Sequence, residues 1–211
     1  MRGAYLRGMG LSCALGTSTE TCISAIPYGP AQPGTVALDD LAEPLRLAFC
    51  RIPDGAELFH AARCSRLVTA AARAAVERSG LTAADIRRLP LFVGSSCFSV
   101  GQSETEYAQA LAWNPQHAHP MPLCGYQDIA VTVQQTLGCA GDTYTYNTAC
   151  TSSANALLGA LRMLKLGWHR HALVLGVELA NRTSLAGFAG LQLLAESLKP
   201  FDAARRGLVL G

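Results

Sequence analysis

One cysteine of this sequence stands where a strand passes into a helix. The β-rich residues 144–147 precede Cys150, and a helix with apolar side chains at Ala154, Leu157 and Leu158 begins a few residues later. The unpaired amides and the positive end of the macrodipole at a helix start favour the thiolate, which is the nucleophilic form of cysteine. The same amides can hold a carbonyl oxygen as negative charge develops on it. The spacing therefore predicts a nucleophile elbow built around cysteine, suited to acyl transfer through a thioester.

The alternative is that Cys150 is only a small buried thiol, since helix starts are common and only some of them are sites. We interpret the other cysteines in this way: Cys13, Cys22, Cys50, Cys64, Cys97, Cys124 and Cys139. No two cysteines have the C-x-x-C spacing of zinc and redox sites, so we predict reduced thiols and no metal site. Position alone leaves both interpretations of Cys150 open.

The histidines supply no obvious general base for Cys150. None of the five falls in a motif, and histidines on loops or at helix ends are ordinary. We therefore interpret them as loop or cap residues: His60, His117, His119, His169 and His171.

The elements that must position Cys150 alternate between strand and helix. Apolar or β-rich runs predict strands at 4–8, 89–94, 143–146 and 171–177. Apolar periodicity and cap signals predict helices at 18–26, 60–79, 102–113, 126–137 and 151–166. Five prolines and no sustained period make 27–59 a long irregular insertion. Such alternation predicts an α/β fold with a largely parallel sheet covered on both faces.

Composition excludes several classes of protein. Half of the 211 residues are apolar and 15% are charged, so the chain is not a disordered tail. The net charge is +2 and basic residues form no long run, so nucleic acid is not an expected partner. No apolar stretch approaches the ~18–20 residues that span a bilayer. Arg7 interrupts the apolar region that a signal peptide would need at the amino terminus. We expect no membrane partner and a cytoplasmic location.

Several motifs in order resemble the β-ketoacyl synthase family of the thiolase superfamily. The run 148–153, Thr-Ala-Cys-Thr-Ser-Ser, matches the family's active-site signature, and residues 8–16 look like its first strand and turn. Residues 173–178 look like the next core strand with its acidic residue, Glu178. Gly187-Phe188 matches the position of a gating phenylalanine, and residues 199–202 match a Pro-Phe-Asp motif. The resemblance implies the amino-terminal half of a thiolase-like fold, with 1–211 as one domain and a mostly parallel mixed sheet.

The resemblance also implies an activity and its site residues. Cys150 would be the acyl-accepting nucleophile, with Thr148, Thr151 and Phe188 on the substrate side. Without the resemblance, Phe188 between glycines could simply fill a core gap, and Asp202 could be only a turn former. Such enzymes bind no cofactor: acyl groups arrive as phosphopantetheine thioesters on acyl carrier protein, and malonyl-carrier protein is decarboxylated and condensed. The assisting histidines lie in the second half of the family fold, so the isolated chain is expected to be incomplete.

Three functions follow in order of preference. The first is condensation of the β-ketoacyl synthase type in fatty acid or polyketide biosynthesis. The second is a noncatalytic synthase-like partner or chain-length-factor-type subunit, which retention of Cys150 disfavours. The third is a hydrolase or transacylase that uses the cysteine alone. In each case we expect acyl carrier protein as a partner and a homodimer or heterodimer with another synthase chain, because a half-fold leaves apolar surface uncovered.

Overall fold

A computed structural model describes residues 3–60, 62–116 and 125–211. The chain divides into two compact units, one formed by Met1–Gly10 with His60–Leu179 and the other by Leu11–Phe59 with Ala180–Gly211. The expectation of one domain over 1–211 stays a prediction. No helix in the described ranges is long and apolar enough to cross a membrane.

The first unit is built on a parallel sheet of three strands in the order β4-β3-β5. The strands are β3 (Leu91–Gly94), β4 (Thr143–Tyr146) and β5 (Leu173–Gly176). Phe92 of β3 pairs with Tyr144 on one side and Val174 on the other. The predicted α/β class and parallel pairing are confirmed.

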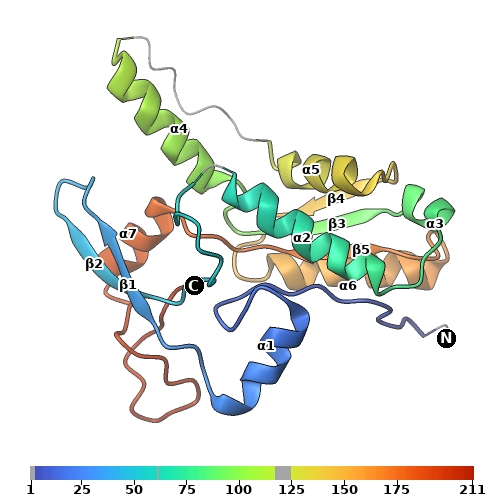
Figure 1. The fold of residues 1–211 in the computed structure, drawn as a ribbon, viewed down its shortest axis with the longest axis horizontal. Coiled ribbons are helices and arrows are strands. Elements are labelled where there is room, and N and C mark those ends of the chain that lie inside the picture. The colour runs from blue at the N-terminus through green and yellow to red at the C-terminus, as the bar shows by residue number, and fades with distance from the viewer. Residues whose placement is uncertain (1–2, 61, 117–124) are drawn as a thin grey trace. The chain divides into compact units, whose positions relative to one another are not determined.

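Helices cover both faces of this sheet (Figure 1). Helices α2 (Arg63–Glu77) and α5 (Asp128–Leu137) lie on one face and α6 (Ser152–Leu166) lies on the other. The unit also contains α3 (Ala83–Arg87) and α4 (Val100–Trp113). Leu91 and Val93 point into one buried cluster with Val133 of α5, while Phe92 between them packs with Ala156 and Ala160 of α6. The two-residue period of a strand thus places α5 and α6 on opposite faces.

The predicted first strand at 4–8 is wrong: the structure gives this segment no strand pairing. Two glycines bring this part of the chain close to the backbone of α2. A methyl carbon added at Gly8 would lie 2.0 Å from the carbonyl oxygen of Ala75, and one at Gly10 would lie 1.9 Å from that of Ala71. Arg7 interrupts the apolar run that a strand buried on both faces requires, and the glycines favour close approach to the helix instead.

The second unit contains elements that the sequence did not predict. They are the antiparallel hairpin of β1 (Gly34–Leu38) and β2 (Leu45–Phe49), and the helix α7 (Arg182–Gly190). The unit also holds the predicted α1 (Thr19–Ala25), capped by Ser18, and a 3-10 turn η1 (Ile26–Tyr28).

The expectation that 27–59 is irregular throughout is therefore wrong. Val36 and Leu38 of the hairpin alternate toward a small core with Phe49 and Leu185. Pro33 and Pro44 each stand one residue before a strand, where a missing N–H does not break the ladder. Proline-rich composition masked two strands that are too short to show a sustained period.

Candidate active site

Cys150 lies in the turn between β4, which ends at Tyr146, and α6, which begins at Ser152. The preceding residue, Ala149, has a φ of +53°. A positive φ costs a residue with a side chain about 1–3 kcal/mol and persists only where its surroundings enforce it. Cys150 itself is exposed. The predicted sharp turn from strand to helix is therefore present, with the thiol on the surface of the first unit.

Side chains of the turn hold its backbone in place. The Ser152 hydroxyl accepts a hydrogen bond from the Thr148 N–H (2.9 Å) and donates one to the Ala149 carbonyl oxygen (2.6 Å). The Thr151 hydroxyl donates to the Thr148 carbonyl oxygen at 2.8 Å. The Asn155 amide, one turn into the helix, donates to the Thr148 and Thr151 hydroxyls at 2.8 and 3.3 Å. These bonds brace the backbone on both sides of Cys150.

Glycines let the amino end of α6 approach the sheet. A methyl carbon at Gly94, the last residue of β3, would lie 2.3 Å from the carbonyl oxygen of Ser152. One at Gly176, the last residue of β5, would lie 2.6 Å from the Ser153 hydroxyl oxygen. Backbone-to-helix contact this close tolerates no side chain. The start of α6, and Cys150 with it, is thereby held against the carboxyl ends of two strands.

A second polar cluster joins the loops that follow β3 and β5. The Glu178 carboxylate accepts hydrogen bonds from the Ser96 hydroxyl (2.7 Å) and from the Cys97 thiol (2.7 Å). The buried Ser95 hydroxyl accepts from the backbone N–H groups of Phe98 (2.8 Å) and Cys97 (3.3 Å). The Ser95 N–H donates to the carbonyl oxygen of Tyr146 at 3.2 Å, which ties this loop to the strand leading to Cys150.

The thiols differ in how readily they ionise. Burial, reinforced by the Glu178 carboxylate, raises the pKa of Cys97 to about 12. Burial raises the pKa of Cys64 to about 11. It also raises the pKa values of Cys22, Cys50 and Cys139. Nucleophilic chemistry at neutral pH needs a thiolate, so these five thiols are poor candidates for it, whereas Cys150 is exposed.

The structure brings together only part of the predicted site. Thr148 and Thr151 lie with Cys150 in the braced turn. Phe188 is half-buried in α7 of the second unit, so its place beside Cys150 stays a prediction. Asn155 was not among the predicted site residues. A polar side chain one turn into the helix, on the side of the turn, is the signal that could have marked it.

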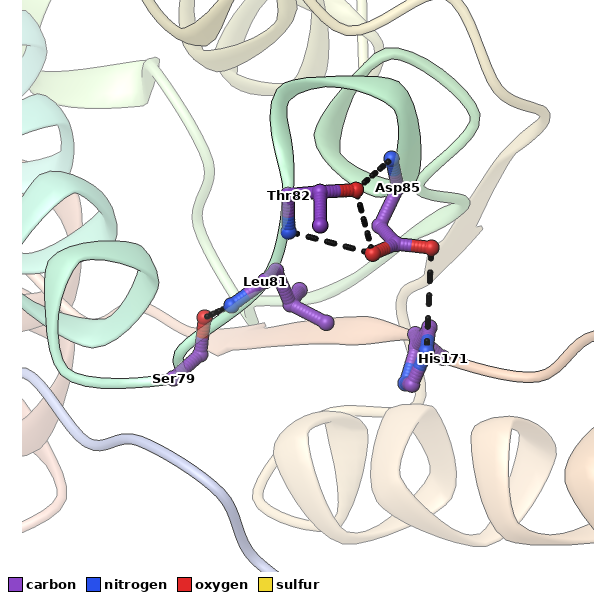
Figure 2. A network of polar contacts seen from close by, with 5 residues as sticks. All are labelled: Ser79, Leu81, Thr82, Asp85 and His171. Atoms are coloured by element: carbon purple, nitrogen blue, oxygen red, sulfur yellow. Dashed lines mark hydrogen bonds and ion pairs between the residues drawn. The ribbon is translucent and has the colours of Figure 1, made fainter.

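The described histidines, His60, His169 and His171, lie in loops, as predicted. The Nδ1 atom of His60 accepts from the Ala62 N–H at 3.2 Å. The His169 ring packs edge-on against Tyr144 with centroids 6.5 Å apart, and His171 Nε2 lies 4.0 Å from an Asp85 carboxylate oxygen (Figure 2). His117, His119 and Cys124 lie outside the described residues.

A family comparison matches most of the chain. The model described as "Beta-ketoacyl synthase, N-terminal domain" matches residues 49–211. The chain belongs to the β-ketoacyl synthase family. The match includes Cys150 and all three strands of the sheet, as well as the Pro-Phe-Asp segment at 200–202.

Solved ketosynthases share the thiolase-like fold. A ketosynthase in complex with its chain length factor from Xenorhabdus doucetiae superposes with a TM-score of 0.70 at 23% identity, covering 100% of this chain and 57% of that one. A β-ketoacyl synthase from Burkholderia phymatum gives a TM-score of 0.69 at 22% identity, covering 99% and 56%. This synthase-family chain thus spans little more than half the length of those proteins.

A curated relative matches a shorter stretch. "Probable polyketide synthase 10" of Dictyostelium discoideum is 30% identical over 123 residues, which are 56% of this chain and 5% of that protein. The similarity therefore covers only a small part of that protein.

Proposed function

We propose that this chain carries the acyl-accepting step of a β-ketoacyl synthase, with Cys150 as the nucleophile. The observation that carries the proposal is the exposed Cys150 in a braced turn at the head of α6, in a chain of this family. The positive φ of Ala149 supports it, because strained backbone gathers at functional sites. Thr148, Thr151 and Phe188 are the proposed substrate-side residues.

The first step transfers an acyl group from acyl carrier protein. The Cys150 sulfur attacks the carbonyl carbon of the phosphopantetheine thioester, and the helix-start amides stabilise the negative charge that develops on the carbonyl oxygen. The bond from that carbon to the phosphopantetheine sulfur breaks. The free carrier thiol takes up the proton lost by Cys150, and the acyl group remains on Cys150.

The second step is the condensation proposed for the whole synthase. Malonyl-carrier protein loses carbon dioxide, and the carbanion that remains attacks the acyl carbon on Cys150. The new carbon–carbon bond forms as the bond to the Cys150 sulfur breaks, which gives a β-ketoacyl thioester. We propose that histidines supplied from outside this chain assist the decarboxylation, in fatty acid or polyketide synthesis.

A partner chain is part of the proposal. Leu157, Leu158 and Leu166 of α6 are 60%, 40% and 64% exposed, which leaves apolar surface on the helix that carries the nucleophile turn. Solved relatives include a ketosynthase with its chain length factor and an acyl-carrier protein in complex with its ketosynthase. We propose that this chain pairs with another synthase chain and receives substrate from acyl carrier protein.

The second candidate is a noncatalytic subunit of the chain-length-factor type, which the likeness to a solved ketosynthase/chain length factor supports. Mixing the chain with a short-chain acyl-carrier protein and measuring intact mass separates the two candidates. We expect one acyl group on the wild-type chain, removable by hydroxylamine, and none on Cys150→Ala. Cys64→Ala is the matched control and should acylate normally. No adduct on the wild type, with or without a synthase chain, would favour the noncatalytic subunit.

A further inference from the structure

Two thiols of the second unit lie in contact with each other. The sulfur atoms of Cys13 and Cys22 are 3.5 Å apart, and the Cys13 thiol donates a hydrogen bond to the Cys22 sulfur. Both residues belong to the second unit, so the contact does not depend on the first. The function proposed for Cys150 uses neither thiol. The pair is therefore a candidate site of its own.

A tight turn brings Cys13 against the start of α1. The Cys13 N–H donates to the Gly16 carbonyl oxygen at 2.9 Å, and the Gly16 N–H donates back to Cys13 at 3.0 Å. In α1, the Thr21 N–H donates to the Ser18 hydroxyl at 3.2 Å, and the Cys22 N–H donates to the Ser18 carbonyl oxygen at 3.0 Å. A methyl carbon added at Gly16 would lie 2.6 Å from the side-chain methyl carbon of Thr21. The turn is thus packed on the helix, and the folded backbone keeps the two sulfur atoms together.

The two thiols differ in their exposure. Cys13 is half-buried, whereas Cys22 is 1% exposed and donates its thiol hydrogen to the Gly16 carbonyl oxygen at 3.2 Å. Burial, reinforced by the neighbouring Cys13 thiol, raises the pKa of Cys22. A dissolved reagent therefore reaches Cys13 first. Cys22 is a poor nucleophile toward solvent, but its contact with the Cys13 sulfur gives it the high effective concentration of an intramolecular reaction.

We infer that Cys13 and Cys22 form a reversible disulfide by exchange with a small dissolved disulfide of the glutathione type, and that this bond fastens the start of α1. The Cys13 sulfur first attacks one sulfur of the dissolved disulfide, whose S–S bond breaks, and the released thiol takes up the proton lost by Cys13. The Cys22 sulfur then attacks the Cys13 sulfur, and the second thiol leaves with the proton lost by Cys22. Two protein thiols are oxidised, and one small disulfide is reduced to two thiols.

The new bond joins positions that are nine residues apart in sequence and that enclose the Ser18 cap of α1. Covalent closure of such a loop removes conformations from the unfolded chain more than from the folded one. The first turn of α1 should therefore open less often in the oxidised chain than in the reduced chain. Amide hydrogen exchange measures such local opening.

Incubation of the full chain with oxidised glutathione tests the inference. The Cys150→Ala background removes the exposed thiol, which would otherwise form a mixed disulfide with glutathione. After the remaining thiols are blocked, cleavage at Glu20 separates Cys13 from Cys22 unless a disulfide joins them. We expect the two peptides to stay joined, with the mass of a disulfide. Amide exchange at the start of α1 should slow at least about threefold, and dithiothreitol should reverse both changes.

Matched variants assign the two roles. Cys22→Ala should retain one glutathione on Cys13, whereas Cys13→Ser should leave Cys22 unmodified at the same time point, and circular dichroism checks the fold of both. Cys64→Ala, a change in the first unit, is the control and should form the disulfide at the rate of its parent chain.

A comparison with the unfolded chain tests whether the fold brings the thiols together. The equilibrium constant for disulfide formation against glutathione should be at least about tenfold larger in buffer than in urea that unfolds the chain. Separated peptides in the oxidised chain, unchanged amide exchange, or an equilibrium constant no larger in buffer than in urea would overturn the inference.

Discussion

At the scale of single residues, exposure and neighbouring charge separate the cysteines. Cys97 and Cys150 each follow a strand of the same sheet, yet Cys97 is buried and donates its thiol hydrogen to Glu178, whereas Cys150 is exposed. A thiol bonded to a carboxylate in this way is stabilised in its protonated form. Among the cysteines that the structure describes, Cys150 is exposed, whereas burial raises the pKa values of Cys22, Cys50, Cys64, Cys97 and Cys139.

We expect Cys150 to be the most reactive thiol at neutral pH. With a pKa of about 12, Cys97 holds about one part in 10⁵ of its thiol as thiolate at pH 7. Limiting iodoacetamide followed by peptide mass mapping should label Cys150 at least about tenfold faster than Cys97 or Cys64. Faster labelling of Cys97 or Cys139 would contradict the assignment.

Phe188 provides a second prediction at this scale. The small core of the second unit is filled by Leu185 with residues of the hairpin, while Phe188 is half-buried. Phe188→Ala should therefore lower the free energy of unfolding by less than the ~3–5 kcal/mol that removal of a fully buried ring costs. If Phe188 gates the acyl site, the substitution should also widen the range of acyl chains that Cys150 accepts.

The readouts for Phe188 are acylation by short and long acyl-carrier substrates beside a denaturant melt. Leu185→Ala is the matched control: it should lose about 2–5 kcal/mol without a change in chain selectivity. A destabilised Phe188→Ala with unchanged selectivity would return Phe188 to the core.

At the scale of elements, the position of the turn that holds Cys150 depends on how closely α6 approaches the sheet. Gly94 and Gly176 end two neighbouring strands and both contact the first turn of α6. Gly159, farther along the helix, contacts the Tyr146 ring in the same way, with an added methyl carbon 2.1 Å from its hydroxyl oxygen. Helix α6 can therefore pack closely on the sheet at several points along its length, because glycine has no side chain there.

Gly94→Ala should displace the start of α6. The added carbon meets backbone atoms, which cannot rotate away, so we expect a loss of about 1–3 kcal/mol in the free energy of unfolding and slower labelling of Cys150. Gly187→Ala is the control, because its added carbon meets nothing within 4 Å and it lies in helix α7; it should be neutral or stabilising by up to about 1 kcal/mol. Equal effects of the two substitutions would show that the close approach does not position the turn.

At the scale of the whole molecule, the direction of the strands separates His169 and His171 from Cys150. Cys150 follows the carboxyl end of β4, whereas His171 precedes β5 and His169 packs on Tyr144 near the start of β4. In a parallel sheet all the strands begin at one end of the sheet and finish at the other. These two histidines are therefore at the amino ends of the strands, whereas Cys150 is at the carboxyl ends.

We expect this chain by itself to accept an acyl group but not to complete condensation. Acyl-carrier protein followed by malonyl-carrier protein should leave the acyl group on Cys150, and mass measurement should find no β-ketoacyl product until a complementary synthase chain is added. The variant pair His169→Ala and His171→Ala should acylate like the wild type. Product formed by this chain alone, and lost in the histidine variants, would show that the local histidines do assist decarboxylation.

The sequence alone determined the strand, turn and helix around Cys150. The predicted strand 143–146 matches β4 at both ends, and the predicted helix 151–166 differs from α6 by one residue. Those elements depend on local signals: side-chain period, cap residues and a glycine stop at Gly167, which has the left-handed conformation. The hydrogen bonds of Asn155 are local as well, but many side-chain pairings are possible one turn apart, and only the folded structure selects one.

The tertiary structure alone decided which segments join the sheet and which of the described thiols are buried. Residues 4–8 have a plausible strand pattern, but they do not pair with β3, β4 or β5, and Gly8 lies against the backbone of α2 instead. Burial raises the pKa of Cys97, and so does the carboxylate of Glu178, which lies 81 positions away in the chain. Both outcomes depend on competition between distant segments for the same partners, and the free energy of such contacts is set by burial and geometry that no local pattern contains.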